Sequence, residues 1–418
     1  MNRATREHQA PVFLPIHPAL LAVILFSVFA LYLFSAEWLG AQYANTYFGA
    51  DGWHYSQIAE GKFFERSLRF HPVTVLAAFG WMKIFQPLTA WLDPFLILRA
   101  MFALIGTLGV WAAISAFATM FGNRYAALLG IVYASTLGIW YFSSIEETKI
   151  ISATLAAVYI AIYLHLREDW TLRRAIALTA VLLVACLNEI VAGLLVVIPA
   201  LDALIRRGLN WRDVRWIGLH AMAGVLALVL LEILARLRPD DASAEAANHF
   251  GLLLWYIMQN DYSLQALYAF VLRWFLFNLA APEAAVYDAN PDIGFGGDFA
   301  PSILNYFGSP GGIALVIVAA AIAVISVWKR PRRKFTRSGI AIVAALGAYI
   351  FLRGTFFFVW LPSECMLYAP SITLALLLIA VMPLMRSTFA YKNFVLGALA
   401  AAMLLANGFF IFTAQTFP

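Results

Sequence analysis

Charged side chains are scarce in this chain of 418 residues. Only 12% of the residues are Asp, Glu, Lys or Arg, whereas 63% are hydrophobic. A soluble globular protein carries about 25% charged residues, so this composition excludes one. The net charge of +5 does not indicate a nucleic-acid partner, because the basic residues lie in short segments between apolar runs. The sequence therefore predicts an all-α polytopic membrane protein whose main partner is the lipid bilayer.

Cysteine is nearly absent, and several familiar catalytic motifs do not occur. The two cysteines, Cys186 and Cys365, provide neither a disulfide framework nor a thiolate metal site. No His/Cys/Asp cluster has the spacing of a zinc site, and the sequence has neither a P-loop nor a GxSxG motif. The sequence assigns no certain cofactor. It leaves a divalent cation between Asp51 and Glu146 as an open alternative.

Apolar runs long enough to span a membrane recur along the whole chain. A helix of roughly 17–25 apolar residues crosses a bilayer. Runs of this kind occupy residues 17–35, 97–120, 125–142, 149–166, 213–235, 312–328, 338–352, 367–385 and 393–413. The first run lacks a convincing small-residue cleavage site, so we interpret it as a retained helix and not as a signal peptide.

The run 175–205 requires a different arrangement, because a pair of arginines flanks each end. A single crossing would place one pair outside and would also export the basic segment 329–334. Two short helices that meet near Asn188–Glu189 avoid both problems, since a turn at membrane depth is tolerated where it lines a cavity. This hairpin gives about 11 membrane segments in a single membrane domain, 1–418, with the N-terminus in the cytoplasm. About 18 Lys and Arg then lie in the cytoplasm and about 10 outside, as the positive-inside rule requires.

Two segments between the apolar runs are much longer than the rest, and this topology places both outside. The first outer loop, 36–96, contains a semi-apolar run, 73–85, that is too short to cross and is expected to lie along the membrane surface. The second, 237–311, is predicted to hold interfacial helices followed by an ordered flap, because structureless loops of that length are uncommon.

The first concentration of polar groups outside the membrane is the stretch 49–61. In a helix, Asp51, His54, Tyr55 and Ile58 fall at i, i+3, i+4 and i+7, which places a carboxylate, an imidazole and a phenol on one face. An alternative is that Asp51 is an N-cap and the aromatic residues anchor an interfacial helix.

Other polar residues near the predicted outer face are candidates for a site. Ser144 and Glu147 have the spacing of a capping box, which would leave Glu146 free to point into a cavity. Lys149 either binds substrate or pairs with a neighbouring glutamate. An intramembrane acid such as Glu189 is a functional hypothesis by default, although it needs a cation or a proton as partner. Arg353 either binds a phosphate through its guanidinium group or extends to the lipid headgroups.

In the first outer loop, Asp51 is followed by His54 and Tyr55 at helical spacing. Further segments of interest are Arg69-Phe70-His71-Pro72, Arg99, the turn 143–149, the hairpin 175–205, Leu352-Arg353-Gly354 and the segment 360–370. Together they resemble the GT-C glycosyltransferases, in particular the protein O-mannosyltransferase and aminoarabinose-transferase branch. Two positions depart from the pattern: Gly52 follows Asp51 where relatives often carry a second acid, and Asn188–Glu189 stands where they often carry a lysine.

The resemblance implies an integral-membrane enzyme that moves a sugar from a polyprenyl-phosphate donor to an acceptor hydroxyl on the extracytoplasmic side, in a bacterial inner membrane. The acceptor is a protein, lipid or glycan. It implies Asp51 and Glu146 as catalytic residues, with Asp51 as the base. The predicted substrate-binding residues are His54, Tyr55, Arg66, Arg69, His71, Glu147, Lys149, Glu189, Arg353 and Glu364.

Two other classes of protein remain as alternatives. A transporter or flippase of a lipid-linked or small polar substrate commonly shows paired halves with discontinuous helices at corresponding positions. This sequence shows no such pairing, and its polar residues gather at the predicted outer face. A non-enzymatic assembly subunit would not require Asp51, Glu146 and Arg353. A shared cavity around those three side chains would distinguish an enzyme from either alternative.

Overall fold

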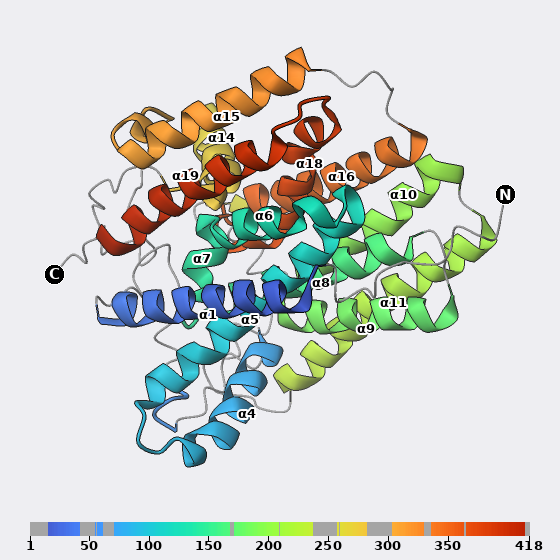
Figure 1. Cartoon of the computed structure of the whole chain (residues 1–418). Coiled ribbons are helices and arrows are strands. Elements are labelled where there is room, and N and C mark those ends of the chain that lie inside the picture. Colours follow the sequence, from blue (N-terminus) through green and yellow to red (C-terminus); the bar gives the residue numbers. More distant parts are fainter. Residues whose placement is uncertain are drawn as a thin grey trace.

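The computed structural model describes residues 16–41, 55, 57–61, 71–167, 171–208, 210–236, 257–258, 260–281, 303–329, 336–362 and 365–413. Within these ranges the regular elements are all helices, and no strand occurs. The all-α prediction is therefore confirmed. Figure 1 shows the elements as one bundle of helices.

Eight of the described helices are long and apolar enough to cross a bilayer. They are α1 (Pro18–Ala41), α5 (Pro94–Phe121), α8 (Lys149–Leu166), α11 (Trp211–Arg236), α15 (Pro310–Trp328), α16 (Arg337–Trp360), the α17–η6–α18 run (Cys365–Arg386) and α19 (Lys392–Thr413). A further pair, α6 (Asn123–Ala134) and α7 (Leu137–Ser143), is bent by 64° and raises the number to nine if it forms one span. The chain is an integral membrane protein, and the predicted number of about 11 spans stays a prediction.

Local sequence signals fix where several of these helices begin. The Ser309 hydroxyl accepts a hydrogen bond from the Gly312 amide (3.0 Å), and Pro310 occupies the first helical position of α15. Thr336 caps α16 in the same way, through the Gly339 amide at 3.1 Å. A side-chain oxygen before the first turn satisfies an amide that has no partner within the helix, so these spans begin at defined residues.

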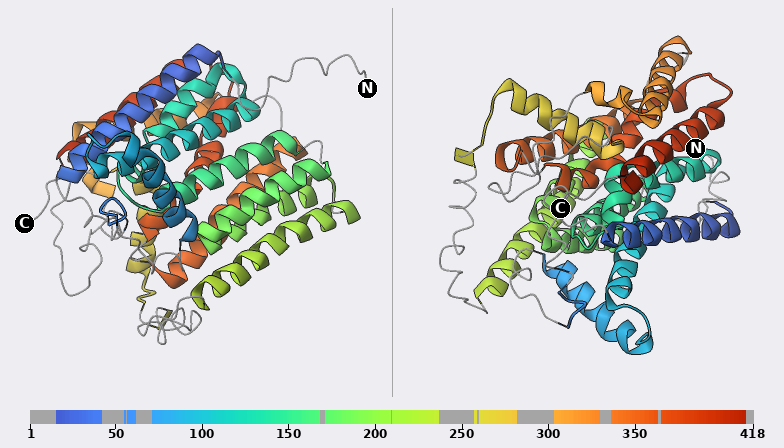
Figure 2. Two further views of the ribbon diagram at one scale, coloured as in Figure 1. Left: turned by 90° about the horizontal axis from the view of Figure 1, so that it is seen from below. Right: turned by 90° about the vertical axis from the view of Figure 1, so that its left-hand side faces the viewer.

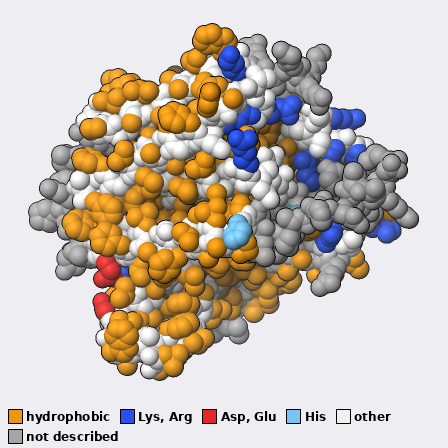
Figure 3. Space-filling model, in the orientation of Figure 1, with side chains coloured by type: hydrophobic (Ala, Val, Ile, Leu, Met, Phe, Trp, Pro, Cys, Tyr) orange, Lys and Arg blue, Asp and Glu red, His pale blue; other side chains and the backbone are white. Residues whose placement is uncertain are grey.

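The two ends of the bundle differ in charge. Helix α8 packs against α5 and α9 (Leu172–Asn188), and it runs from Lys149 at one end to Arg167 at the other. We call these the Lys149 end and the Arg167 end. At the Arg167 end, the Arg167 guanidinium binds the buried Asp202 (2.6 Å), and Arg337 donates to the Ile205 carbonyl. Lys and Arg side chains gather on this side, at the right of Figure 3, whereas Asp and Glu lie at the lower left.

The segment between α8 and α11 runs along α8 and returns. Helix α9 ends at Asn188, whose amide donates to the Ser152 hydroxyl in the first turn of α8 (2.9 Å). The chain continues through η3 (Ile190–Val196) into α10 (Val197–Arg207), where Asp202 lies beside Arg167 at the far end of α8. The backbone is therefore interrupted at Glu189, which is extended with ψ of 108°.

Buried asparagines stabilise the backbone at three interruptions of this kind. Asn188 lies at the break after α9. Asn278 follows the π-helical turn η4 (Leu272–Phe277). It donates to the Ala369 carbonyl (3.0 Å), where η6 (Ala369–Ile372) follows α17 (Cys365–Tyr368). Asn407 donates to the Ser135 carbonyl at the α6–α7 bend (2.6 Å) and accepts from the Ala281 amide (2.8 Å). Because lipid offers no hydrogen bonds, each irregular backbone segment needs such partners within the protein.

Helix α4 (Pro72–Leu88) and the beginning of α5 project from the bundle, at the bottom of the right-hand view in Figure 2. With 28 residues, α5 is about 42 Å long, which exceeds the roughly 30 Å of a hydrocarbon core. The connection between α4 and α5 therefore lies beyond the span. The N-terminus of α4 reaches back to Asn188, so this projecting helix remains in contact with the interrupted hairpin.

Candidate functional site

A buried ion pair lies near the Lys149 end of the bundle. Arg353 of α16 is 1% exposed, and its Nη2 donates to Glu189 Oε1 and to Ser371 Oγ (3.2 Å). The guanidinium carbon lies 5.1 Å from the centre of the Phe357 ring. Arg353 therefore points into the protein and does not extend to the lipid headgroups. The cation that Glu189 requires is Arg353.

The pair leaves hydrogen-bonding capacity on both partners. Among the described residues, Arg353 Nε and Glu189 Oε2 are buried and have no hydrogen-bond partner. The indole nitrogens of Trp274 and Trp360 are also buried without a hydrogen-bond partner in the described part of the chain. The centres of both rings lie within 6.0 Å of the centre of the Phe357 ring. Because unsatisfied buried groups are rare and costly, these atoms are candidate hydrogen-bonding groups for a bound ligand.

A second cation lies close to this pair. Lys149 is 5% exposed, and its ammonium lies 4.2 Å from the centre of the Tyr368 ring and 4.0 Å from Glu147 Oε1. The Tyr368 ring stacks on Phe357 at 4.1 Å, and Phe357 is the ring beneath Arg353. Lys149 and Arg353 therefore share one aromatic cluster. The pairing of Lys149 with a neighbouring glutamate is confirmed.

The predicted capping box at Ser144–Glu147 is wrong. Helix α8 begins at Lys149, and Thr148 is its N-cap. Ser144 Oγ instead donates to the Trp140 carbonyl (2.9 Å) and so completes the last turn of α7. Glu147 Oε1 accepts from the Thr148 amide at 2.7 Å. The spacing misleads here because a separate helix, α7, begins after the 64° bend and ends next to Ser144. The serine hydroxyl therefore bonds to α7 and does not cap α8.

Glu146 is paired as well, and it is not free as predicted. Arg99 Nε of α5 donates to Glu146 Oε1 (2.8 Å), and Arg99 Nη1 donates to Glu37 Oε1 of α1 (3.1 Å). The Glu146 side chain is 5% exposed and that of Glu37 is 48% exposed. One arginine thus joins a buried and an exposed carboxylate at the end of the bundle where α5 begins.

His71 lies where α4 meets the break in the hairpin. Its Nδ1 is 2.6 Å from the Asn188 carbonyl oxygen. The Asn188 side chain accepts from the amide and the hydroxyl of Thr74 (3.2 and 2.7 Å). Burial, followed by the positive charge of Lys149, lowers the pKa of His71 to about 4, against smaller opposing effects of the Asn188 carbonyl and of Glu189.

The structure thus brings five of the sequence-predicted residues into one region: His71, Glu147, Lys149, Glu189 and Arg353. Glu146 lies at the same end of the bundle, bound to Arg99, and Tyr55 is buried with 1% exposure. Five other predicted residues lie outside the described residues: Asp51, His54, Arg66, Arg69 and Glu364.

Sequence reasoning missed the roles of two residues in this region. The sequence predicts Asn188 only as the position of a turn, yet it joins α4, α8 and the hairpin. Ser371 binds Arg353 from the start of the penultimate span. The signal for Asn188 was available, because an amide side chain in an apolar run requires partners within the protein.

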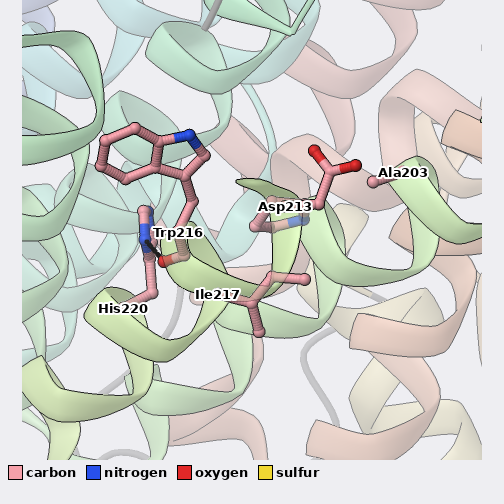
Figure 4. Close-up of a pocket in the computed structure, with 6 residues that line it drawn as sticks. Ala203, Asp213, Trp216, Ile217 and His220 are labelled. Atoms are coloured by element: carbon pink, nitrogen blue, oxygen red, sulfur yellow. Dashed lines mark hydrogen bonds between the residues drawn. The ribbon is translucent and has the colours of Figure 1, made fainter. Parts of the chain in front are cut away.

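A small pocket at the Arg167 end does not resemble a substrate site. Pro199 and Ala203 of α10 line it with Asp213, Trp216, Ile217 and His220 of α11 (Figure 4). It has room for about one water molecule. Within the described ranges, no group of three or more His, Cys, Asp or Glu side chains is arranged to hold a metal ion. The divalent cation predicted between Asp51 and Glu146 stays a prediction, because Asp51 lies outside the described residues.

Solved structures show what this arrangement of helices is similar to. No protein-family model and no curated protein matches the chain. The crystal structure of ArnT from Cupriavidus metallidurans bound to undecaprenyl phosphate matches at a TM-score of 0.52 and 14% identity, and the match covers 88% of this chain. The apo state of the same protein matches at 0.51 and 14% identity over 95% of this chain.

The matches cover only part of ArnT: 60% of the chain in the lipid-bound structure and 77% in the apo structure. The two matches nevertheless include 88% and 95% of this chain. The chain therefore has the fold seen in these ArnT structures, and the expected fold class is confirmed.

Proposed function

We propose that this protein is a glycosyltransferase that moves a sugar from a polyprenyl-phosphate donor to an acceptor hydroxyl on the extracytoplasmic side. The observation that carries the proposal is that two buried cations, Arg353 and Lys149, lie at one aromatic cluster, in a region that also holds unsatisfied hydrogen-bond donors. Burying two cations in a membrane protein is costly, and such residues mark functional sites by default. The ArnT structure with bound undecaprenyl phosphate supports the donor class.

The two cations fit a phosphate leaving group. When the sugar leaves its carrier, negative charge develops on the phosphate, and preorganised cations stabilise that charge most effectively where water is excluded. Arg353 already binds Glu189 and Ser371 through Nη2, so its buried, unpartnered Nε is a donor available to a phosphate oxygen. Lys149 adds positive charge from α8. Glu189 neutralises Arg353 while the site is empty.

The transfer itself requires a base. Asp51 accepts the proton of the acceptor hydroxyl, whose oxygen forms the new bond to the anomeric carbon. The bond from that carbon to the phosphate oxygen breaks, and its electron pair leaves with the polyprenyl phosphate. Glu146, which Arg99 holds in place, orients the acceptor. A divalent cation at these two acids remains part of the proposal.

The charge distribution supports the proposed orientation. Basic side chains gather at the Arg167 end, and the positive-inside rule places such residues in the cytoplasm (Figure 3). The region around Lys149 and Arg353 then faces the opposite, extracytoplasmic side. We propose a bacterial inner membrane with the N-terminus of the chain in the cytoplasm.

Mass spectrometry of lipids that co-purify with the protein tests the donor class. We expect a polyprenyl phosphate on the wild type and on Asp51→Asn, but much less on Arg353→Gln. Membranes that contain the Asp51→Asn protein should show no sugar transfer, because the base is absent. Transfer by that variant, or a wild type that binds no polyprenyl phosphate, would contradict the proposal.

One observation favours a transporter instead, namely the interrupted backbone at Glu189 between α9 and η3, since transporters bind substrates at discontinuous helices. Protein in liposomes distinguishes the two functions. A transporter would move labelled undecaprenyl phosphate between leaflets without an acceptor, whereas a glycosyltransferase would release it only when a sugar-loaded donor meets an acceptor.

A further inference from the structure

The hydrogen bond between His71 and Asn188 fixes which ring nitrogen carries the proton. A backbone carbonyl oxygen only accepts hydrogen bonds, so His71 Nδ1, at 2.6 Å from it, must be the donor. In the neutral imidazole the other nitrogen, Nε2, then carries a lone pair and acts as an acceptor. His71 is only partly buried, and Nε2 makes no hydrogen bond within the part of the chain that the structure describes.

The surroundings of His71 favour this neutral form. Among the described residues, the charged groups that act on it are Lys149 at the start of α8 and Glu189 at the end of α9. The positive charge of Lys149 and burial both disfavour an imidazolium, and they outweigh Glu189, whose carboxylate is already bound to Arg353. With a pKa of about 4, the ring is neutral at physiological pH.

Asn188 holds the ring in this position through several bonds. Its carbonyl binds His71, and its side chain binds Thr74 on α4 and Ser152 on α8. His71 is the N-cap of α4 but makes no capping bond with its own side chain, so Asn188 Oδ1 satisfies the Thr74 amide in its place. The ring therefore has no capping role, and Asn188 at the end of α9 fixes its position.

We propose that His71 Nε2 accepts a hydrogen bond from a substrate hydroxyl group, either on the donor sugar or on the acceptor, with Asn188 as the positioning residue. The inference rests on the proposed function. The sequence predicts His71 only as a substrate-binding residue, and the inference gives it a defined role as an acceptor. A phosphate oxygen that carries no proton is an acceptor and gains nothing from a second acceptor.

Three substitutions separate an acceptor from a cation. His71→Gln keeps a side-chain oxygen near the position of Nε2, His71→Asn keeps only a donor near Nδ1, and His71→Lys supplies a positive charge. His165→Gln serves as the matched control, because His165 is partly buried near the other end of α8. Each full-length protein is placed in nanodiscs for titration with undecaprenyl phosphate and with undecaprenyl phosphates that carry different single sugars. Membranes that contain the protein supply the acceptor for turnover.

For undecaprenyl phosphate itself, we expect affinities within twofold of the wild type for all variants, since this ligand carries no sugar hydroxyl. If the hydroxyl belongs to the donor, His71→Asn and His71→Lys lose roughly five- to tenfold in affinity for a sugar-loaded lipid, as for one lost hydrogen bond. If it belongs to the acceptor, binding is unchanged and turnover falls instead. In both cases His71→Gln retains more than the other two.

A cation role for His71 gives the reverse order. His71→Lys would then keep its affinity for undecaprenyl phosphate, and His71→Gln and His71→Asn would lose it. That result, or three variants that match the wild type in every measurement, would overturn the inference. A wild type that binds no polyprenyl phosphate refutes the proposed function itself, so the two failures are distinguishable.

Discussion

Glu189 and Arg353, which are 164 residues apart in the sequence, form an ion pair inside the helical bundle. The pair joins the interruption after α9 to the C-terminal half of α16. Its two side chains are 6% and 1% exposed, so neither charge faces bulk solvent. The hairpin therefore holds Arg353 in place, and Arg353 in turn stabilises an irregular backbone segment.

This relationship predicts unequal effects of single and double substitutions. Arg353→Leu leaves an uncompensated buried carboxylate and should lower the stability of the folded protein by about 3–5 kcal/mol. Glu189→Leu should act similarly by leaving the guanidinium unpaired. The double variant should recover much of the loss, because replacing a buried pair with apolar residues is often neutral. Thermal unfolding of the purified proteins in detergent provides the comparison.

The double variant also separates stability from function. It should remain unable to retain a polyprenyl phosphate, because the cation that binds the leaving group is gone. If the double variant bound the lipid as well as the wild type, Arg353 would have only a structural role.

Arg99 offers a contrast between a buried and an exposed partner. Glu146 is 5% exposed and Glu37 is 48% exposed, although both accept hydrogen bonds from the same guanidinium. Glu37→Gln should change stability by about 0–1 kcal/mol, as is typical of exposed pairs. Arg99→Gln should cost several times more, because Glu146 then loses its partner in a buried setting. Equal shifts of the unfolding temperature for the two variants would show that burial does not control this pair.

The pH dependence of stability tests the state of His71. Its pKa is lowered from 6.5 to about 4 by burial and by Lys149, so the unfolded chain binds a proton that the folded protein excludes between these values. Linkage then makes the contribution of His71 to stability fully present above pH 6.5, with a loss that grows as the pH falls towards 4. Between pH 8 and pH 4, the unfolding temperature of the wild type should therefore approach that of His71→Gln as the pH falls.

The exposed His17 at the start of α1 provides a comparison variant, His17→Gln. If the unfolding temperatures of the wild type and of His71→Gln differ by a constant amount across the whole pH range, the imidazole at position 71 is an ordinary, solvated one.

Much of this fold follows from the composition and length of the apolar runs. Each predicted run lies at least partly within a described helix, because a membrane core permits few backbone arrangements other than helices. The interruption near Asn188–Glu189 was also predicted, from the arginine pairs that flank 175–205. Charge placement restricts topology in a way that requires no knowledge of packing.

The contacts of the site were harder to predict. The sequence indicates that Glu189 needs a cation or a proton as partner, but Arg353 is 164 residues away and no local pattern links the two. The capping-box pattern at Ser144 failed because local spacing carries no information about a 64° bend that ends one helix and starts another. Pairing across elements depends on which helices pack together, and that is decided by the whole bundle.

Asn407 should contribute far more to stability than Asn393, which lies near the beginning of the same helix, α19. The Asn407 amide donates to the Ser135 and Leu279 carbonyls (2.6 and 3.0 Å), and its oxygen accepts from the Ala281 amide. Asn407→Ala leaves these backbone groups without partners inside the membrane, at about 1–3 kcal/mol for each unsatisfied group.

Asn393 is the matched control for this substitution. Its side-chain oxygen has no hydrogen-bond partner among the described residues, so Asn393→Ala removes little. Alanine also has the higher helix propensity, by about 0.7 kcal/mol or less, which favours the variant slightly. We therefore expect a clear fall in unfolding temperature for Asn407→Ala and none for Asn393→Ala. Equal shifts would mean that the backbone groups bound by Asn407, such as the Ser135 carbonyl at the bend between α6 and α7, find other hydrogen-bond partners in water or lipid headgroups.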